Sequence, residues 1–315
     1  MATPPTSDAL LQQAVDFYEL KGSKLEASIA LGLKKTTYSS RLTAAQAKGF
    51  RPNVVRQGVV PYKKVKLGRS HMVIPDTQVK PDVPIDHFRH IANYALEMRP
   101  DVIIQIGDWA DMHSLSAYDK GKRCYEGRRY VKDIDAANAS LDLFEKTIED
   151  YNRTHPDTAY NPDKHLNYGN HEHRIIRATD LDAALHGKLT LDDLDFGRRG
   201  WNTHQFLEVV TIDGIQYSHY FISGAMGRPV SSAAALLKAR GGSATMGHVQ
   251  RLDIAVHPQT QRIGLMSGIC YQHNEDYLGP QGNAAPRQIV MKHEVEDGRY
   301  DLMCVSLNFL RKRYS

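Results

Sequence analysis

Residues 166–172 read Leu166-Asn167-Tyr168-Gly169-Asn170-His171-Glu172, and this stretch decides the fold. We expect a short strand that runs into a tight turn, because a glycine after a strand lets the backbone turn sharply. The amide, imidazole and carboxylate that follow Gly169 then project from the carboxyl edge of a sheet, where α/β proteins place their ligand sites. Taken alone, the stretch also fits an ordinary loop with a capping asparagine.

Four further clusters of polar side chains accompany this stretch. Two lie upstream, each after an apolar run: Asp76-Thr77-Gln78, and Gly107-Asp108-Trp109-Ala110-Asp111. Two lie downstream: His219 within 217–220, and Gly247-His248-Val249-Gln250. Each piece alone has a plain structural explanation as a helix cap, a turn or a satisfied core histidine. Together, oxygen and nitrogen donors at successive strand ends indicate a metal site.

In this order the clusters resemble the calcineurin-like metallophosphoesterase superfamily, whose pattern is Asp-x-His, Gly-Asp-x-x-Asp, Gly-Asn-His-Glu/Asp, His and Gly-His-x-His. The resemblance covers residues 70–270 and implies an α/β fold, a four-layer αββα sandwich of two mixed sheets flanked by helices. It also implies metal-dependent hydrolysis of phosphate esters. The chain departs from the pattern at Gln78 and Gln250, where the family usually has histidine.

The resemblance also implies roles for individual residues. The metal ligands would be Asp76, Gln78, Asp108, Asn170, His219, His248 and Gln250, with Asp108 shared between two divalent cations. A carboxylate can bridge two cations because each oxygen has a free lone pair. His171 would donate a proton to the leaving oxygen, and Asp111 would orient His171. Arg174 and Arg228 are candidate contacts for the substrate phosphate, with ordinary surface arginines as the alternative.

The two glutamines bear on which metal binds. The resemblance gives Asp76, Gln78 and Gln250 to a first metal and Asn170, His219 and His248 to a second. A Gln side chain offers a neutral carbonyl oxygen where histidine offers a nitrogen, so the first site becomes a harder ligand set. We therefore expect Mn²⁺ or Mg²⁺ there rather than Zn²⁺, with another transition metal compatible with the histidine-containing site. The alternative is that Gln78 and Gln250 mark a decayed, one-metal or inactive site.

The length of 315 residues favours two domains. Apolar spacing predicts helices over 8–20, 24–31 and 34–42, with Ser7 able to cap the first and Gly22 ending it. Residues 1–50 resemble a helix-turn-helix DNA-binding module, followed by a basic linker over 51–69 and a catalytic domain over 70–315. The expected DNA-contacting residues are Lys34, Lys35, Thr36, Thr37, Ser39, Ser40 and Arg41. A plain three-helix module with solvated lysines is the alternative.

The charge is distributed unevenly along the chain. Residues 1–70 hold 12 Lys+Arg and 4 Asp+Glu, a net charge of +8, whereas the remainder holds 28 basic and 32 acidic residues, a net charge of −4. The linker contributes Arg51, Arg56, Lys63, Lys64, Lys66 and Arg69 and has no acidic residue. This asymmetry favours an N-terminal region, residues 1–70, that binds nucleic acid, and a remainder of the chain that binds cations. A solvated tether is the other interpretation of the linker.

Within the body we expect strands over 71–76 and 101–106 and helices over 84–99 and 131–151. Residues 173–189 are also expected to be helical. Short strands over 206–212, 215–220, 263–267 and 300–309 would form a second sheet packed on the first. The basic and aromatic residues of 114–129 suit either a surface loop or contact with a nucleic-acid strand.

The resemblance implies a hydrolase acting on phosphodiester bonds, and the DNA-binding type of module at residues 1–50 favours nucleic acid, DNA in particular, as substrate and partner. The architecture resembles phage- or prophage-encoded phosphoesterases. A phosphomonoesterase, including a protein serine/threonine phosphatase, and a DNA-binding regulator with a degenerate body are the alternatives. Without a signal-peptide pattern or a long apolar run, we expect a cytoplasmic location and no membrane contact. Cys124, Cys270 and Cys304 are expected to be reduced.

Overall fold

The computed structural model describes residues 6–53, 68–275 and 279–315, and its internal contacts divide the chain into two compact units, Met1–Lys66 and Leu67–Ser315. Most of the expected basic linker, including Arg56, Lys63, Lys64 and Lys66, lies outside the described residues. Each unit has an apolar core of its own.

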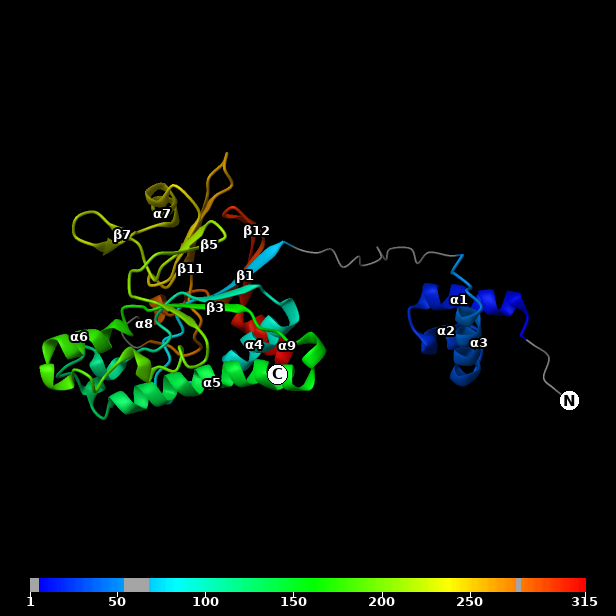
Figure 1. Ribbon diagram of the computed structural model, residues 1–315, viewed down its shortest axis with the longest axis horizontal. Helices are drawn as coiled ribbons and strands as arrows, with labels where there is room; N and C mark the ends of the chain where they lie inside the picture. The colour runs from blue at the N-terminus through cyan, green and yellow to red at the C-terminus, as the bar shows by residue number, and fades with distance from the viewer. Residues whose placement is uncertain (1–5, 54–67, 276–278) are drawn as a thin grey trace. The chain divides into compact units, whose positions relative to one another are not determined.

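The first unit consists of three helices, α1 (Asp8–Lys21), α2 (Lys24–Ala30) and α3 (Lys35–Ala47) (Figure 1). Gly22 ends α1 in a left-handed conformation at a φ of 72°, as its position suggested. Ser7 stands at the start of α1, but its side chain makes no capping hydrogen bond. Tyr38 is fully buried, and its hydroxyl donates to the carbonyl of Ala14 at 2.6 Å, which ties α3 to α1.

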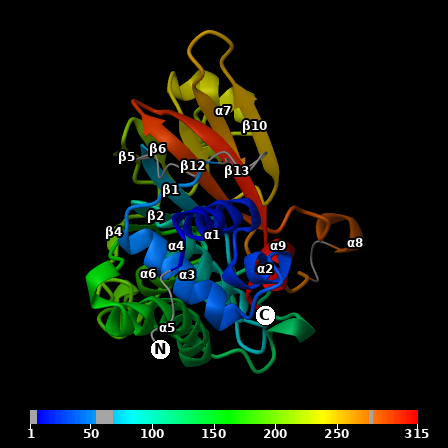
Figure 2. The same ribbon diagram turned by 90° about the vertical axis from the view of Figure 1, so that its right-hand side faces the viewer.

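The second unit is built on a six-stranded sheet in the order β13-β12-β1-β2-β3-β4. The neighbours β1 to β4 pair in parallel, whereas β12 pairs antiparallel with both β1 and β13. In Figure 2, β12 lies next to β1, and β13 lies on the other side of β12 at the edge of the sheet. The strands are β1 (Arg69–Ile74), β2 (Val102–Gln105), β3 (Asp163–Asn167), β4 (Asn202–His204), β12 (Gln288–Glu296) and β13 (Arg299–Ser306).

A second, five-stranded sheet has the order β10-β11-β9-β6-β5 and is also mixed, because β9 pairs in parallel with β11 and β6 while the outer pairs are antiparallel. Its strands are β5 (Val210–Ile212), β6 (Ile215–Tyr217), β9 (Ala244–Met246), β10 (Leu252–Val256) and β11 (Ile263–Ser267). A separate hairpin joins β7 (Ile222–Ser223) to β8 (Arg228–Pro229).

The helices complete four layers (Figure 1). Met72 and Ile74 of β1 face a core shared with α4, α5 and α9, whereas Val73 between them faces a core shared with β6 and β11. Helix α7 packs its Leu236 on the far side of the second sheet. The expected αββα order is therefore present. The helices are α4 (His87–Met98), α5 (Tyr130–Thr154), α6 (His173–Leu181), α7 (Ala233–Arg240), α8 (Gly279–Gly282) and α9 (Leu307–Tyr314).

The structure corrects three sequence-based expectations. The alternating stretch 300–309 does not join the second sheet: it forms β13 at the edge of the first, and the oxygen of Ser306 then caps α9. The strand expected to start at Phe206 starts at Val210, because Leu207 has a left-handed backbone with a φ of 67°. The helix expected over 173–189 ends at Leu181. Short 3-10 turns lie at His113–Leu115, Arg123–Tyr125, Pro156–Thr158, Ala183–Leu185 and Leu191–Asp193.

Within the described ranges, no helix combines the length and the apolar character that crossing a lipid bilayer requires.

Candidate metal centre

The loops after β1 and β2 lie together at the carboxyl edge of the first sheet. The main-chain carbonyl of Asp108 accepts hydrogen bonds from the main-chain nitrogens of Thr77 at 3.0 Å and Gln78 at 2.8 Å. The side chains of Asp76 and Asp108 are both buried. The parallel pairing of β1 and β2 thus brings the two carboxylates to one edge, as their positions after successive strands predicted.

Glu172 joins the third loop to the second. Its Oε2 accepts hydrogen bonds from the main-chain nitrogens of Asp108 at 3.1 Å and Gly169 at 2.8 Å. Its Oε1 accepts one from the nitrogen of Ala110 at 2.8 Å, and the side chain is fully buried. The sequence showed Glu172 only as the last residue of a motif. Its part as a clamp between two loops depends on the fold and has no separate signal in the sequence.

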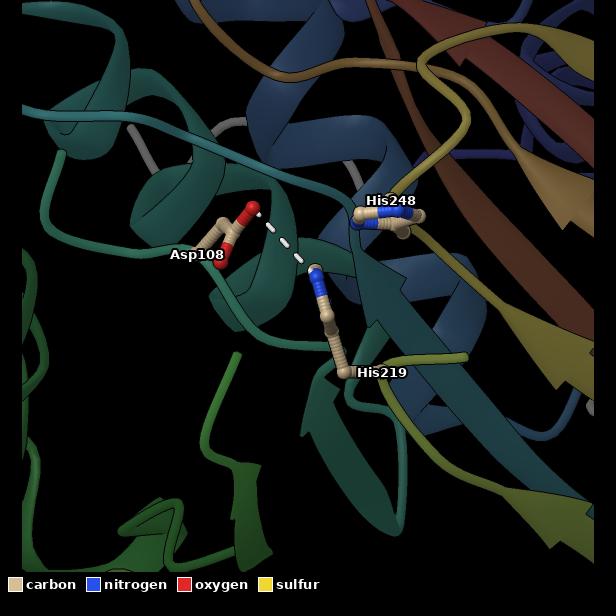
Figure 3. A group of neighbouring side chains, drawn as sticks. All are labelled: Asp108, His219 and His248. Atoms are coloured by element: carbon tan, nitrogen blue, oxygen red, sulfur yellow. Dashed lines mark ion pairs between the residues drawn. The ribbon is translucent and has the colours of Figure 1, made fainter. Parts of the chain in front are cut away.

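Asp108, His219 and His248 converge on a common point (Figure 3). Each offers one ligand atom, and these atoms all lie within 4.8 Å of one another. Oδ1 of Asn170 lies 2.9 Å from Nε2 of His219 and 2.7 Å from Nδ1 of His248. Four of the seven expected ligands therefore present their side chains to one another.

Backbone contacts orient this group. Nδ1 of His219 donates to the carbonyl of Ile106 at 3.0 Å, which turns Nε2 toward Oδ2 of Asp108, 3.3 Å away. Histidines that bind metals commonly use their other ring nitrogen in this way. Asp76, the fifth expected ligand, accepts hydrogen bonds from the main-chain nitrogen of His248 at 3.0 and 3.2 Å.

The donor set fits a divalent cation. Burial disfavours the charged form of Asp76, and with the nearby negative charge of Asp108 it raises the pKa of Asp76 to about 7. Burial also disfavours imidazolium, yet Asp108 and the other buried carboxylates outweigh this effect and raise the pKa of His219 to about 9. Burial and the charge of His219 lower the pKa of His248 to about 4, so this imidazole is neutral, the form that binds a metal ion. The oxygen and imidazole donors suit manganese, iron or zinc.

Two motif glycines leave room for this cluster. A Cβ at Gly169 would collide with the carboxylate and main-chain nitrogen of Asp108, and a Cβ at Gly247 would collide with the carboxylate of Asp76. The backbone at these two positions must therefore stay bare for the aspartates to keep their places.

The side chains of the two glutamines make no hydrogen bond to the convergent group within the described ranges. Gln78 is buried, and its amide nitrogen has no hydrogen-bond partner among the residues that the structure describes. Oε1 of Gln250 accepts a hydrogen bond from the hydroxyl of Tyr271 at 3.2 Å. Both offer a carbonyl oxygen, but within the described ranges no side-chain hydrogen bond joins either of them to Asp108 or His248. Their part as ligands stays a prediction.

Four of the expected ligands have a left-handed backbone, with φ values of 39° at Gln78, 54° at Asp108, 65° at His248 and 54° at Gln250. Residues other than glycine are rarely found there, and each such residue costs about 1–3 kcal/mol. Strain of this kind gathers at functional sites, where the surrounding structure holds it. The sequence carries no signal for it at these positions.

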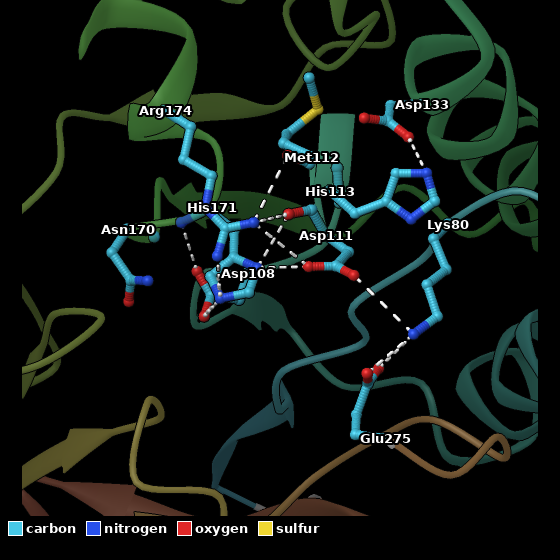
Figure 4. Close-up of polar contacts among 12 residues, drawn as sticks. Lys80, Asp108, Asp111, Met112, His113, Asp133, Asn170, His171, Arg174 and Glu275 are labelled. Atoms are coloured by element: carbon cyan, nitrogen blue, oxygen red, sulfur yellow. Dashed lines mark hydrogen bonds and ion pairs between the residues drawn. The ribbon is translucent and has the colours of Figure 1, made fainter. Parts of the chain in front are cut away.

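His171 and Asp111 form a pair beside the cluster (Figure 4). Nδ1 of His171 lies 2.8 Å from Oδ1 of Asp111, and Nε2 lies 3.7 Å from Oδ2 of Asp108. Burial opposes the charged imidazole, but Asp108 and Asp111 outweigh it and raise the pKa of His171. The main-chain nitrogen of His171 also donates to Asp108 at 3.0 Å. This places an oriented imidazole within reach of anything that Asp108 holds.

The two candidate arginines differ in position. Nη1 of Arg174 donates to the main-chain carbonyl of Asp111 at 2.8 Å, and Nη2 lies 3.2 Å from Nε2 of His171. Arg174 therefore contacts the His171–Asp111 pair. Arg228 lies exposed in β8, where it pairs with Ser223. No hydrogen bond or ion pair connects Arg228 to the cluster within the described parts of the chain.

An outer ion pair was absent from the sequence-based expectations. Nζ of Lys80 binds both oxygens of Glu275 at 2.7 and 2.8 Å and lies 3.9 Å from Oδ2 of Asp111. Nε2 of His273 also contacts Glu275 at 2.7 Å. Lys80 follows Asp76 by four residues and could have been suspected from that spacing. Glu275 is distant in sequence and carries no motif.

The residues expected to contact DNA lie on α3 and at its start. Lys34, which occupies the N-cap, and Lys35, Thr36, Thr37 and Ser40 are exposed, whereas Ser39 and Arg41 are half-buried. Tyr38 and Leu42, four residues apart on the buried face of α3, belong to the core of this unit.

No protein-family model and no curated protein matches the chain. Among solved structures, the chain is similar to Vps29 from Entamoeba histolytica complexed with Zn²⁺, at 13% identity and a TM-score of 0.33. It is also similar to a dimetal phosphatase from Danio rerio, at 10% identity and a TM-score of 0.33. Each match covers 76% of this chain and 99% of the other. Similarity at these values assigns no function to this chain, so the functional assignment depends on the geometry of the site.

The fold and the site together define a class: an α/β protein of two packed mixed sheets with a candidate divalent-metal centre at the carboxyl edge of the first sheet.

Proposed function

We propose that this protein is a metal-dependent phosphoesterase that hydrolyses phosphodiester bonds, with nucleic acid as its substrate. One observation carries the proposal: Asp108, His219 and His248 converge within 4.8 Å of one another, next to an imidazole that a carboxylate orients. Metal ligands beside a positioned proton donor are what hydrolysis of a phosphate ester requires.

The residues that would hold two cations are Asp76, Gln78, Asp108, Asn170, His219, His248 and Gln250, with Asp108 between them. We expect Mn²⁺, with Mg²⁺ or another transition metal as the alternative. Bound cations supply a Lewis acid for the nonbridging phosphate oxygens and lower the pKa of water. The buried carboxylates of Asp76 and Asp108 supply the negative charge that retains the cations.

His171 is the proposed proton donor to the leaving oxygen. Nδ1 of His171 donates to Asp111, so Nε2 is the atom directed toward the centre, 3.7 Å from Oδ2 of Asp108. Nη2 of Arg174 can only donate and lies 3.2 Å from the same Nε2, so this contact has to open when Nε2 carries the proton for the leaving oxygen. The carboxylate of Asp111 fixes the ring orientation and favours the protonated form. Arg174 contacts the same pair, and its guanidinium has five N–H donors, more than these contacts use. We assign its remaining donors to a phosphate oxygen.

The proposal of nucleic acid as substrate rests on the first unit. Residues 1–70 carry a net charge of +8, and α3 exposes Lys34 and Lys35 at its start. A cationic helix face attracts a phosphate backbone and releases counterions from it. We infer that α1 to α3 bind DNA in the manner of a helix-turn-helix module and supply substrate to the metal centre.

The test is hydrolysis of labelled single- and double-stranded DNA, RNA, a small diester and a phosphomonoester in the presence of Mn²⁺, with Asp108→Asn as the inactive control. We expect cleavage of diesters by the wild type and its loss in the variant. Faster turnover of the phosphomonoester than of the diesters would show that the protein is a phosphomonoesterase and not a phosphodiesterase. Tight DNA binding without cleavage under any divalent cation would make the protein a DNA-binding regulator.

A further inference from the structure

A row of aromatic rings leads away from the metal centre. Tyr220 lies against His248 with ring centroids 4.6 Å apart, and Phe206 lies against Tyr220 at 5.6 Å in a T-shaped arrangement. His173 then stacks on Phe206 at 4.8 Å with 27° between the ring planes. Phe206 also lies 6.4 Å from the ring of His219. The row therefore contacts both histidines of the candidate metal cluster.

The fold assembles this row from segments far apart in sequence. Phe206 follows β4, Tyr220 follows β6, His248 follows β9, and His173 begins α6. These strands end at the same side of the two sheets as the metal ligands, so the rings and the ligands share their supports. We call Phe206, Tyr220 and His173 the aromatic platform.

Tyr220 packs against the apolar cluster that contains Leu236 and Met246, but all three rings of the aromatic platform are only partly buried. Phe206, Tyr220 and His173 are each half-buried, whereas the core aromatics Trp109 and Phe196 are 0% and 1% exposed. Phe206 belongs to none of the four apolar clusters formed by the described residues. Neighbouring rings fix the orientation of these side chains, and part of their surface is exposed to solvent. A further aromatic ring can therefore stack on them.

We propose that the aromatic platform stacks against the base of a nucleotide that flanks the scissile phosphate. The inference rests on the proposed phosphodiesterase function and names its substrate class. Every nucleobase has a π-face, so aromatic side chains bind bases with little regard to sequence. Because Tyr220 lies directly against His248, a phosphate held at the metal centre places its attached nucleoside beside Phe206 and Tyr220.

The experiment compares two diesters that differ only in the bases. One is thymidylyl-thymidine, and the other is the same dinucleotide with tetrahydrofuran abasic sugars in place of both nucleosides. The wild type with Mn²⁺ is expected to have a KM about 5- to 150-fold lower for thymidylyl-thymidine, the range that loss of one base-stacking contact produces. The kcat values are expected to be similar, because stacking acts equally on bound substrate and transition state.

The variants Phe206→Leu and Tyr220→Leu are expected to raise KM for thymidylyl-thymidine and to leave KM for the abasic diester unchanged. Phe206→Trp is expected to retain the preference, which separates stacking from a loss of folding. Phe309→Leu, at an aromatic residue of α9 that is 47% exposed, is the matched control and should change neither substrate. Equal KM values for both diesters in the wild type, or an equal loss on both in Phe206→Leu, would overturn the proposal.

A binding measurement keeps the platform testable if no diester is cleaved. Calorimetry then compares thymidine 5′-monophosphate with 2-deoxyribose 5-phosphate on the Mn²⁺-loaded protein. If the protein binds thymidine 5′-monophosphate more tightly than the sugar phosphate, and Phe206→Leu removes this difference, the base-stacking role of the aromatic platform is supported. That result would stand even if the proposed hydrolysis had failed. Equal affinities would overturn the platform as well.

Discussion

Glu172 holds the backbone of Asp108 in place: Oε2 of Glu172 accepts the hydrogen bond from the main-chain nitrogen of Asp108 at 3.1 Å. The same carboxylate also accepts hydrogen bonds from the main-chain nitrogens of Ala110 and Gly169. One buried side chain therefore determines where two ligand-bearing loops meet. The metal centre thus depends on a residue that is not a ligand.

Replacing Glu172 with Gln should loosen both loops. The amide turns one acceptor oxygen into an NH₂ group that faces a backbone N–H, and a buried donor left unsatisfied costs about 1–3 kcal/mol. We expect a comparable loss in the free energy of unfolding and weaker Mn²⁺ binding, measured by urea denaturation and by metal titration. Glu208→Gln is the control, since Glu208 is exposed, accepts the N–H of Gln205 at 2.8 Å and lies 3.5 Å from Nδ1 of His204. Equal effects of the two substitutions would contradict the clamp.

His171→Asn should separate catalysis from metal binding. Because His171 touches Asp108 only through its main-chain nitrogen and at 3.7 Å through Nε2, the metal content should stay as in the wild type. Removal of a general acid should lower kcat by about 10²–10⁴-fold on a dinucleotide. The loss should be smaller on bis(p-nitrophenyl) phosphate, whose leaving group needs no proton. Elemental analysis and steady-state kinetics test both points, with exposed His155→Asn as control. Loss of metal in His171→Asn would show that His171 is a ligand.

Lys80 should stabilise the folded protein, because its ammonium group neutralises the carboxylates of both Glu275 and Asp111. Lys80→Met leaves the carboxylates of Glu275 and Asp111 without the ammonium group that lies between them. The pair is part-buried, with Lys80 20% and Glu275 6% exposed, so the loss should lie between the roughly 1 kcal/mol of an exposed pair and the roughly 3–5 kcal/mol of a fully buried one. We expect the lower end of this range, because His273 still contacts Glu275.

A double-mutant cycle checks this expectation. Lys80→Met combined with Glu275→Gln should recover part of the stability that Lys80→Met loses, as judged by chemical denaturation. Strictly additive losses would mean that Lys80 and Glu275 do not interact.

Low pH should destabilise the second unit, because His71 must take up a proton in a buried position. Burial lowers the pKa of His71 to about 4, more than its hydrogen bond to Asp213 raises it. Between pH 6.5 and pH 4 the unfolded chain therefore binds a proton that the folded protein excludes. The stability that neutral His71 provides is complete above pH 6.5 and is lost as the pH falls toward 4, by about 3 kcal/mol in total. Urea denaturation across this range should show a flatter pH dependence in His71→Gln. An unchanged slope would refute the assignment.

The face of α3 should determine the salt dependence of DNA binding. Lys34→Ala with Lys35→Ala removes two exposed cations. It should lower the slope of log K against log salt by about 2, because each phosphate contact contributes about 0.9. Lys21→Ala with Lys24→Ala changes the charge equally on other helices and should have a smaller effect. Fluorescence anisotropy with a labelled duplex measures both. Identical slopes for the two pairs would exclude α3 as the contact face.

Local patterns in the sequence were sufficient for most of the elements. The β-branched run 101–106 predicted β2, and Gly22 marked the end of α1, because these signals depend on neighbours along the chain. The strand over 300–309 was assigned to the wrong sheet, because alternation shows that a strand is half-buried and does not show which strand it pairs with.

The sequence by itself determined the order of the polar clusters and their places after strands, and hence which side chains could meet at a sheet edge. Only the tertiary structure decided that Asn170, His219, His248 and Asp108 converge, that Glu172 clamps two loops and that Phe206 stands beside Tyr220. The reason is physical. Periodicity and turns follow from local backbone preferences, whereas distances between side chains of different strands depend on how two sheets pack, and no single stretch of sequence encodes that packing.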